Sequence, residues 1–179
     1  KEKLAAITFD DGYKHTFDII QPLFENESIP ATFFANTSHL EDGKLLWFVY
    51  VNALCFEKVF PEISLEGRNF TLTSKKDCHT AWAFLIDRAR QSQDAIAFVE
   101  KVFIRYPLPI WLIEKYIGLD VGQIRRIAES SLFSLGGHTH SHPYMDQLDF
   151  EEQSQQVSKN KQLLENISGK PIQYFAYTG

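Results

Sequence analysis

A strand, a helix and a second strand follow one another at the start of the chain, and this order sets the fold class. Apolar residues 4–9 predict a buried strand, and residues 16–26 predict a helix with Thr16 as its cap and Pro22 inside it. The apolar run 31–35 predicts the second strand. Strands joined through a helix pair in parallel. We therefore expect an α/β fold with a parallel sheet.

The pattern turns largely helical over residues of about 40–119, and the alternation of helix and strand then resumes. In this segment we expect helices at 46–56, 77–90, 94–105 and 110–117, with a turn at 66–69 and a short strand or hairpin edge at 70–73. After it we expect helices at 120–131, capped by Asp120, and at 150–166, and strands at 132–135 and 174–177. We interpret the segment as an insertion within one domain over 1–179, because no flexible linker flanks it. A separate small helical domain is the alternative interpretation. About four core strands are too few for a closed barrel, so the sequence predicts an incomplete polypeptide.

Acidic and imidazole side chains stand at the predicted ends of two strands. Asp10 and Asp11 follow the first strand, and His138 and His142 lie in a polar loop after the strand at 132–135. The carboxyl ends of parallel strands share one edge, where α/β folds usually carry their chemistry. Two imidazoles four residues apart and one carboxylate can bind one metal and leave room for water and substrate. We therefore predict a metal held by Asp11, His138 and His142.

The chemistry of such a site gives Asp10 a separate role. A bound metal lowers the pKa of its water toward ~7 and polarises a carbonyl oxygen. Asp10 would then be the base that takes the proton from this water. Neighbouring residues on a strand point opposite ways, so the two acids need not share one role. By the same alternation, His140 is expected to point away from the two histidine ligands.

Simpler interpretations exist for each motif taken alone. Asp-Asp-Gly suits a surface turn through its backbone preferences, and a histidine-rich loop can be solvated surface. Neither interpretation explains why both motifs stand at strand ends. The two motifs together therefore favour the metal site.

Composition narrows the possible functions. The chain has 179 residues with 18 basic and 23 acidic side chains, a net charge of −5, which disfavours a general nucleic-acid binder. No apolar run reaches the ~18 residues of a membrane span. An aromatic share of 14% suits either a well-filled core or a sugar-stacking surface.

The two cysteines and the first residue indicate no particular function. Cys55 and Cys78 make no disulfide framework and have no metal-type spacing, so we expect both to be packing residues. The first residue is Lys1 and no secretion signal is visible, which allows for a longer gene product.

The motifs together resemble those of a known enzyme family. Residues 8–12, Thr-Phe-Asp-Asp-Gly, match the first motif of the polysaccharide deacetylases, the NodB-homology or carbohydrate esterase family 4 proteins. Residues 138–143 are similar to their second motif, His-Ser/Thr-x-x-His, followed here by proline. Residues 29–34 and 169–171 also resemble family members. The insertion is similar to that of longer members associated with bacterial surface-polysaccharide loci.

This resemblance implies a distorted, incomplete (β/α) barrel whose C-terminal part is missing from this chain. It implies that Asp11, His138 and His142 hold a divalent metal, usually Zn²⁺, with Asp10 as the catalytic base. Thr139 would shape the loop through a hydrogen bond rather than react. The implied reaction is hydrolytic removal of acetyl groups from N-acetylated sugars of a polysaccharide or glycan, with O-acetylated sugars as a further option.

The third motif departs from the family pattern. The family often has Arg-x-Pro-Tyr or Phe-Ala-Tyr-Pro-Tyr-Gly, whereas residues 175–179 read Phe-Ala-Tyr-Thr-Gly. The arginine that orients the base is absent, and Thr178 replaces the proline. Two residues, Tyr177 and Gly179, are therefore candidates to supply the backbone amide of the oxyanion hole. The Leu-x-His that supplies the general acid in the family lies beyond residue 179, so we expect weak or no activity if this were the complete protein.

Three hypotheses of different classes follow. The first is a metal-dependent deacetylase acting on an N-acetylated glycan, without a nucleic-acid partner. The second is a carbohydrate-binding relative that is not catalytic, and the third is an amidase acting on non-sugar C–N bonds. The oligomeric state stays open, as does the compartment between the bacterial cytoplasm and the cell envelope.

Overall fold

The computed structural model describes residues 3–178. The residues up to Lys44 and from Lys115 onward form one compact unit, and Leu45–Glu114 forms a second. The expected insertion of about 40–119 overlaps this second unit. The first unit contains both predicted metal-site motifs.

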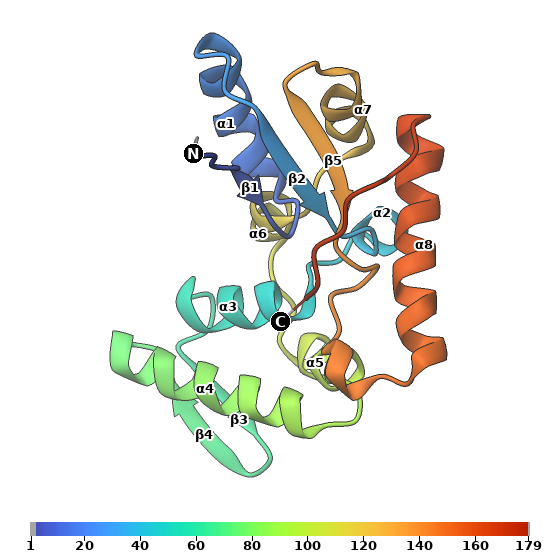
Figure 1. The fold of residues 1–179 in the computed structure, drawn as a ribbon. Helices are drawn as coiled ribbons and strands as arrows, with labels where there is room; N and C mark the ends of the chain where they lie inside the picture. The colour runs from blue at the N-terminus through green and yellow to red at the C-terminus, as the bar shows by residue number, and fades with distance from the viewer. Residues whose placement is uncertain (1–2, 179) are drawn as a thin grey trace. The chain divides into compact units, whose positions relative to one another are not determined.

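A parallel sheet forms the centre of the first unit. Its strands are β1 (Thr8–Phe9), β2 (Ala31–Ala35) and β5 (Phe133–Gly137), in the order β1-β2-β5 (Figure 1). Both strand pairs are parallel, and Ala35 lies opposite Gly137 at the carboxyl ends. The predicted mixed α/β fold with a parallel sheet is confirmed.

The first strand is shorter than the sequence suggests. We expected a buried strand over residues 4–9, but residues 4–8 are exposed and only Thr8–Phe9 is paired. In this register Thr8 lies opposite Thr32, so the residues before Ile7 would lie opposite Pro30 and earlier residues. Proline has no amide hydrogen to continue the ladder, so the pairing stops there.

Helices cover this sheet. They are α1 (Lys14–Asn26), α7 (Val121–Glu129) and α8 (Phe150–Ser168). The first unit also contains the short α2 (His39–Asp42) and the 3₁₀ turn η1 (Met145–Gln147). The expected cap of α1 at Thr16 is wrong, because the helix begins after Tyr13, whose carbonyl accepts from the Phe17 N–H. Asp120 does cap α7, in a capping box with Gln123.

Aromatic rings fill the core between α1 and the sheet. Phe33 on β2 packs edge-on against Phe17 of α1 and Phe133 of β5, with ring centroids 5.3 and 5.5 Å apart. Phe17 and Phe33 are almost fully buried, beside Ile124, Ile127 and Leu164. Part of the high aromatic content therefore belongs to the core. Burying a phenylalanine contributes about 1.5–3 kcal/mol.

The second unit is largely helical, with one hairpin. Its elements are α3 (Trp47–Phe56), β3 (Glu62–Leu65), β4 (Arg68–Thr71), α4 (Lys75–Gln91), α5 (Ala95–Arg105) and most of α6 (Ile110–Tyr116). Strands β3 and β4 pair antiparallel, as the alternative of a hairpin edge predicts. Cys55 and Cys78 are buried and free, consistent with packing. No helix within residues 3–178 has the length and apolar character that crossing a membrane requires.

The expected last strand at 174–177 is reduced to one bridge. Phe175 pairs in parallel with Gly137, whose N–H donates to Tyr174 and whose carbonyl accepts from Ala176 (Figure 1). Upstream of this bridge a cavity of about 220 Å³ lies between β5 and residues 170–174. The two segments separate around it, so no longer ladder forms.

Candidate metal centre

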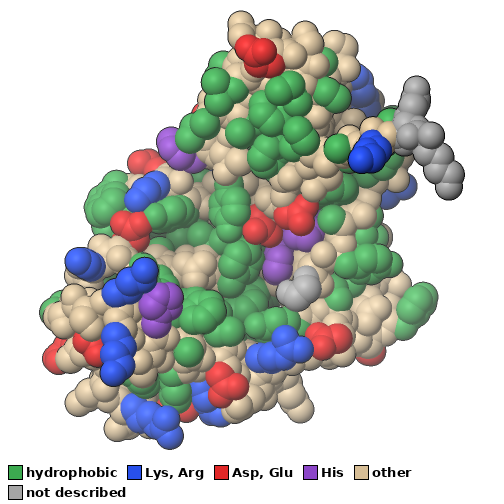
Figure 2. Space-filling view, turned by 60° about the vertical axis from the view of Figure 1, so that its left-hand side comes forward, with side chains coloured by type: hydrophobic (Ala, Val, Ile, Leu, Met, Phe, Trp, Pro, Cys, Tyr) green, Lys and Arg blue, Asp and Glu red, His purple; other side chains and the backbone are tan. Residues whose placement is uncertain are grey.

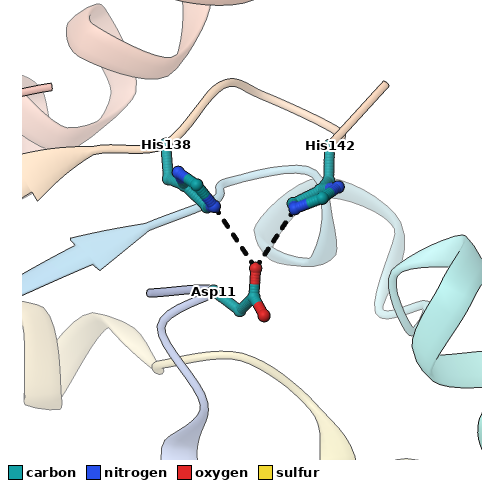
Figure 3. A group of neighbouring side chains, drawn as sticks. All are labelled: Asp11, His138 and His142. Carbon is teal, nitrogen blue, oxygen red and sulfur yellow. Dashed lines mark ion pairs between the residues drawn. The ribbon is translucent and has the colours of Figure 1, made fainter. Parts of the chain in front are cut away.

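Three side chains from distant parts of the sequence converge at the carboxyl end of the sheet. Asp11 follows β1, His138 directly follows β5, and His142 lies further along the same loop. The Nε2 atoms of both imidazoles point at the same oxygen, Oδ1 of Asp11, each at 3.3 Å (Figure 3). One candidate ligand atom from each residue lies within 4.8 Å of the others. The structure thus brings together the three residues that the sequence suggests as ligands.

Left-handed backbone at the strand ends turns these side chains toward one another. The φ angles are 66° at Asp11 and 59° at Gly12, and 63° at Thr139 and 56° at His142. Asp11 is therefore turned by this backbone and not by the strand alternation that we expected. A Cβ on Gly12 would lie 2.9 Å from the Cβ of Ala35, so only glycine fits there. Non-glycine residues in this region carry strain of about 1–3 kcal/mol and cluster at functional sites.

The carbonyl group of Ala176 fixes which nitrogen of His138 faces the site. His138 Nδ1 lies 2.9 Å from this carbonyl oxygen. A carbonyl oxygen only accepts, so Nδ1 carries the proton and the Nε2 lone pair is directed at Asp11. Two residues along, the Thr178 hydroxyl donates to the carbonyl oxygen of Pro143 at 2.9 Å. The third-motif segment therefore contacts the histidine loop at both of its ends.

Hydrogen bonds keep the Asp11 carboxylate anionic. Burial raises the pKa of Asp11, but hydrogen bonds and charge from His138 and His142 outweigh it and hold this pKa far below its usual range. Burial lowers the pKa of His138, whereas hydrogen bonds to Asp11 and Ala176 and nearby negative charge raise it above the ordinary 6.5. Burial, the Asp11 charge and a hydrogen bond with Asp11 raise the pKa of Tyr13. The carboxylate is thus surrounded by groups that favour its charged form.

The donor set suits a small divalent cation. Zinc takes imidazole nitrogen and carboxylate oxygen at about 2.0–2.1 Å, and a tetrahedron of that size has edges of about 3.3 Å. The two Nε2–Oδ1 separations of 3.3 Å match such an edge. An imidazole lone pair directed at a carboxylate also needs a proton or a cation between them. The residues present therefore fit a metal with at least one coordination position left open.

Asp10 lies beside this group without being part of it. Its side chain is exposed, and its charge contributes to the raised pKa of His138. In the space-filling view, acidic and histidine side chains lie against one another at the surface (Figure 2). Asp10 therefore offers a solvent-accessible carboxylate next to the candidate metal ligands.

His140 points away from the group, as the alternation of the loop predicts. Its Nδ1 lies 2.9 Å from the hydroxyl of Thr37, and its Nε2 lies 3.4 Å from a carboxylate oxygen of Glu41. The hydroxyl of Thr139 accepts the His142 N–H at 3.1 Å, which is the loop-shaping bond expected for that residue.

Of the two candidate donors for the oxyanion hole, Tyr177 lies within the described residues. The side chain of Tyr177 is 77% exposed, while its backbone joins Ala176 and Thr178, which both contact the histidine loop. Gly179 lies outside the described residues. The Tyr177 amide is therefore the candidate that the structure describes.

Sequence reasoning missed the residues that hold the histidine loop from behind. Asn36 donates to the carbonyl oxygens of His138 and Thr139, and Asn160 and Gln156 of α8 bind amides of the same loop. A signal was present on α8, where Gln156, Asn160 and the buried Leu164 are spaced by four. A polar residue on the buried stripe of a helix usually has a specific partner.

Fold and site together define an α/β protein with a candidate metal centre at the ends of parallel strands. A family model, Polysaccharide deacetylase, matches residues 1–179. The chain therefore belongs to the polysaccharide deacetylase family, as its motifs suggest, and this family is generally metal-dependent. No curated protein and no solved structure matches the chain.

Proposed function

We propose that the protein is a metal-dependent hydrolase that removes acetyl groups from N-acetylated sugars of a polysaccharide or glycan. O-acetylated sugars are a second class of substrate that the same chemistry would accept. The observation that carries the proposal is the convergence of Asp11, His138 and His142 on one point, at 3.3 Å between nitrogen and oxygen. Membership of the family supports hydrolysis of a C–N bond.

The proposed site holds one divalent cation, with zinc favoured by two nitrogen donors and one oxygen donor. Such a cation, when bound, supplies a Lewis acid that activates water and polarises the acetyl carbonyl group. Asp11 contributes the negative charge, and its lowered pKa preserves that charge well into the acid range. His138 contributes Nε2, because its Nδ1–H is bound to Ala176.

Asp10 is the proposed general base. Its carboxylate is exposed beside the ligands, so it can accept a proton from the attacking water. The backbone N–H of Tyr177 is the proposed oxyanion donor, with Gly179 as the alternative. One such donor commonly contributes about 3–4 kcal/mol to the stability of the transition state.

The scaffold proposed for this chemistry is a partial, distorted (β/α) barrel within one domain over 1–179, with an insertion of about 40–119. The described sheet of three parallel strands and one further bridge is compatible with part of such a barrel. A bacterial glycan as substrate would place the protein in the cytoplasm or at the cell envelope.

Acetate release from N-acetylated oligosaccharides tests the proposal. Release is expected with zinc present, and a chelator should stop it until metal is added back. Binding of the sugar without acetate release would indicate the carbohydrate-binding relative. Release from a small cyclic amide but not from sugars would indicate the amidase.

A further inference from the structure

Two polar side chains of α8 contact the loop that carries both candidate histidine ligands. Asn160 is fully buried, and its Oδ1 accepts the backbone N–H of His138 at 3.2 Å. Its Nδ2 donates to the carbonyl oxygen of Ala35 at 2.9 Å and to the hydroxyl of Thr37 at 3.3 Å. One amide group therefore ties the end of β2 to the first histidine.

Gln156 lies one helical turn earlier and holds the middle of the loop. Its Oε1 accepts the backbone N–H groups of His140 and Ser141 at 3.1 and 3.0 Å. Its Nε2 donates to the Ser141 hydroxyl at 3.0 Å. Asn160 and Gln156 together thus fix the loop at His138, His140 and Ser141. The first of these residues is a candidate ligand, and the last directly precedes the second candidate ligand.

The close approach of Asn160 explains the glycine before the first ligand. A Cβ at Gly137 would lie 2.5 Å from Asn160 Oδ1, well inside contact distance. Thr139 and His142 both have positive φ, and such backbone persists only where surrounding contacts determine it. The bonds from α8 supply such contacts.

We infer that Asn160 and Gln156 are positioning residues of the metal centre, which set its affinity and geometry by fixing the backbone of the histidine loop. This inference rests on the proposed function, because it needs Asp11, His138 and His142 to bind a metal. Partners of metal ligands commonly change metal affinity by about 10- to 100-fold when they are removed. A role in folding alone would leave metal affinity unchanged.

Cobalt titration separates these roles, because the absorption of bound Co²⁺ reports its coordination geometry and affinity without any turnover. Asn160→Ala and Gln156→Ala should each weaken Co²⁺ binding by about 10- to 100-fold and change the spectrum. Gln156→Glu keeps the oxygen that accepts from His140 and Ser141, so its affinity should stay near that of the wild type. Gln156 is only half-buried, so its variants should fold even if Asn160→Ala does not.

Leu164→Ala is the matched control, because Leu164 lies one turn beyond Asn160 and is fully buried, with an apolar side chain that cannot hydrogen-bond to the loop. It should lower the melting temperature and leave Co²⁺ affinity and spectrum unchanged. If Asn160→Ala and Gln156→Ala behaved like Leu164→Ala, the inference would be wrong and the proposed function would stand. If the wild type bound no metal, and His138→Ala changed nothing, both would be overturned.

Discussion

At the scale of single residues, neighbouring acids have different surroundings. Asp11 contacts both imidazoles and has a strongly lowered pKa, whereas Asp10 is exposed beside them. One carboxylate is suited to hold a cation, and the other is suited to exchange a proton with water. The two side chains differ in their surroundings because the backbone turns left-handed at Asp11.

Substitution of each acid should therefore give a different result. Asp11→Ala should abolish metal binding, because it removes the oxygen that both imidazoles face. Asp10→Asn should leave the metal bound and lower turnover by about 10²- to 10⁴-fold, the usual contribution of a general base. Bound metal measured by calorimetry and acetate release measured on the same samples check both results. Wild-type turnover in Asp10→Asn would refute its role as the base.

The raised pKa of His138 predicts a pH dependence in the metal-free protein. Because the folded pKa lies above the ordinary 6.5, the Asp11–His138 ion pair stabilises the fold fully below that pH. This stabilisation is lost as the pH rises through the folded pKa. Asp11→Asn should remove the effect and lower the pKa of His138, because burial then dominates.

Melting temperatures of chelator-treated wild type and Asp11→Asn, compared between about pH 5 and 9, measure the loss. An imidazole titration of His138 by NMR gives the pKa itself. A value below 6.5 in the wild type would contradict the prediction.

At the scale of elements, tight turns at strand ends place the site. The turn after β1 brings Gly12 so close to Ala35 that a Cβ would meet both the Cβ and the Cα of that residue, at 2.9 and 3.0 Å. Gly43, at the end of α2, has a similar φ of 68°, but no atom lies within 4 Å of the place that a Cβ would take there. Substitution of Gly43 therefore measures backbone strain alone, whereas substitution of Gly12 measures backbone strain and close packing together.

Gly43→Ala should lower the free energy of unfolding by about 1–2 kcal/mol, because alanine must adopt the left-handed region. Gly12→Ala should lower it by about 1–3 kcal/mol more, since β1 must also move away from β2. That movement displaces Asp11, so metal affinity should fall in Gly12→Ala alone. Denaturant unfolding and metal titration of both variants check this, and equal losses in the two would argue against close packing at Gly12.

At the scale of the whole molecule, the candidate metal centre brings together segments far apart in the sequence. Asp11 stands at the start of the first unit, and His138 and His142 come after the residues of the second unit. A cation bound to all three would bind the folded chain and not the unfolded one. Metal binding should therefore stabilise the fold by linkage.

Zinc at about one hundred times its dissociation constant should raise the free energy of unfolding by about 2.7 kcal/mol. Asp11→Ala should show no such increase, and His15→Ala, at an exposed histidine outside the group, should show the full increase. Chemical unfolding with zinc and with chelator measures the difference. An equal increase in Asp11→Ala would mean that zinc binds elsewhere.

Much of the site follows from sequence because strand ends of a parallel sheet share one edge. That rule brings Asp11 to His138 and His142 without knowledge of any contact. The bonds of Asn160 and Gln156 could not be predicted in the same way, because they join side chains of α8 to backbone amides of another segment. The orientation of His138 depends likewise on the Ala176 carbonyl group, which any residue would supply.

Local patterns in the chain determined the α/β alternation, the parallel sheet and the residues that bear the chemistry, because periodicity and turn residues report burial and backbone preference along a short stretch. Only the tertiary structure decided where pairing stops. It limited the first strand to Thr8–Phe9, opposite Thr32 and Phe33, and it reduced the expected last strand to the bridge at Phe175. Pairing of strands and support of a loop depend on which distant groups come within hydrogen-bonding distance. The local sequence does not predict these partners.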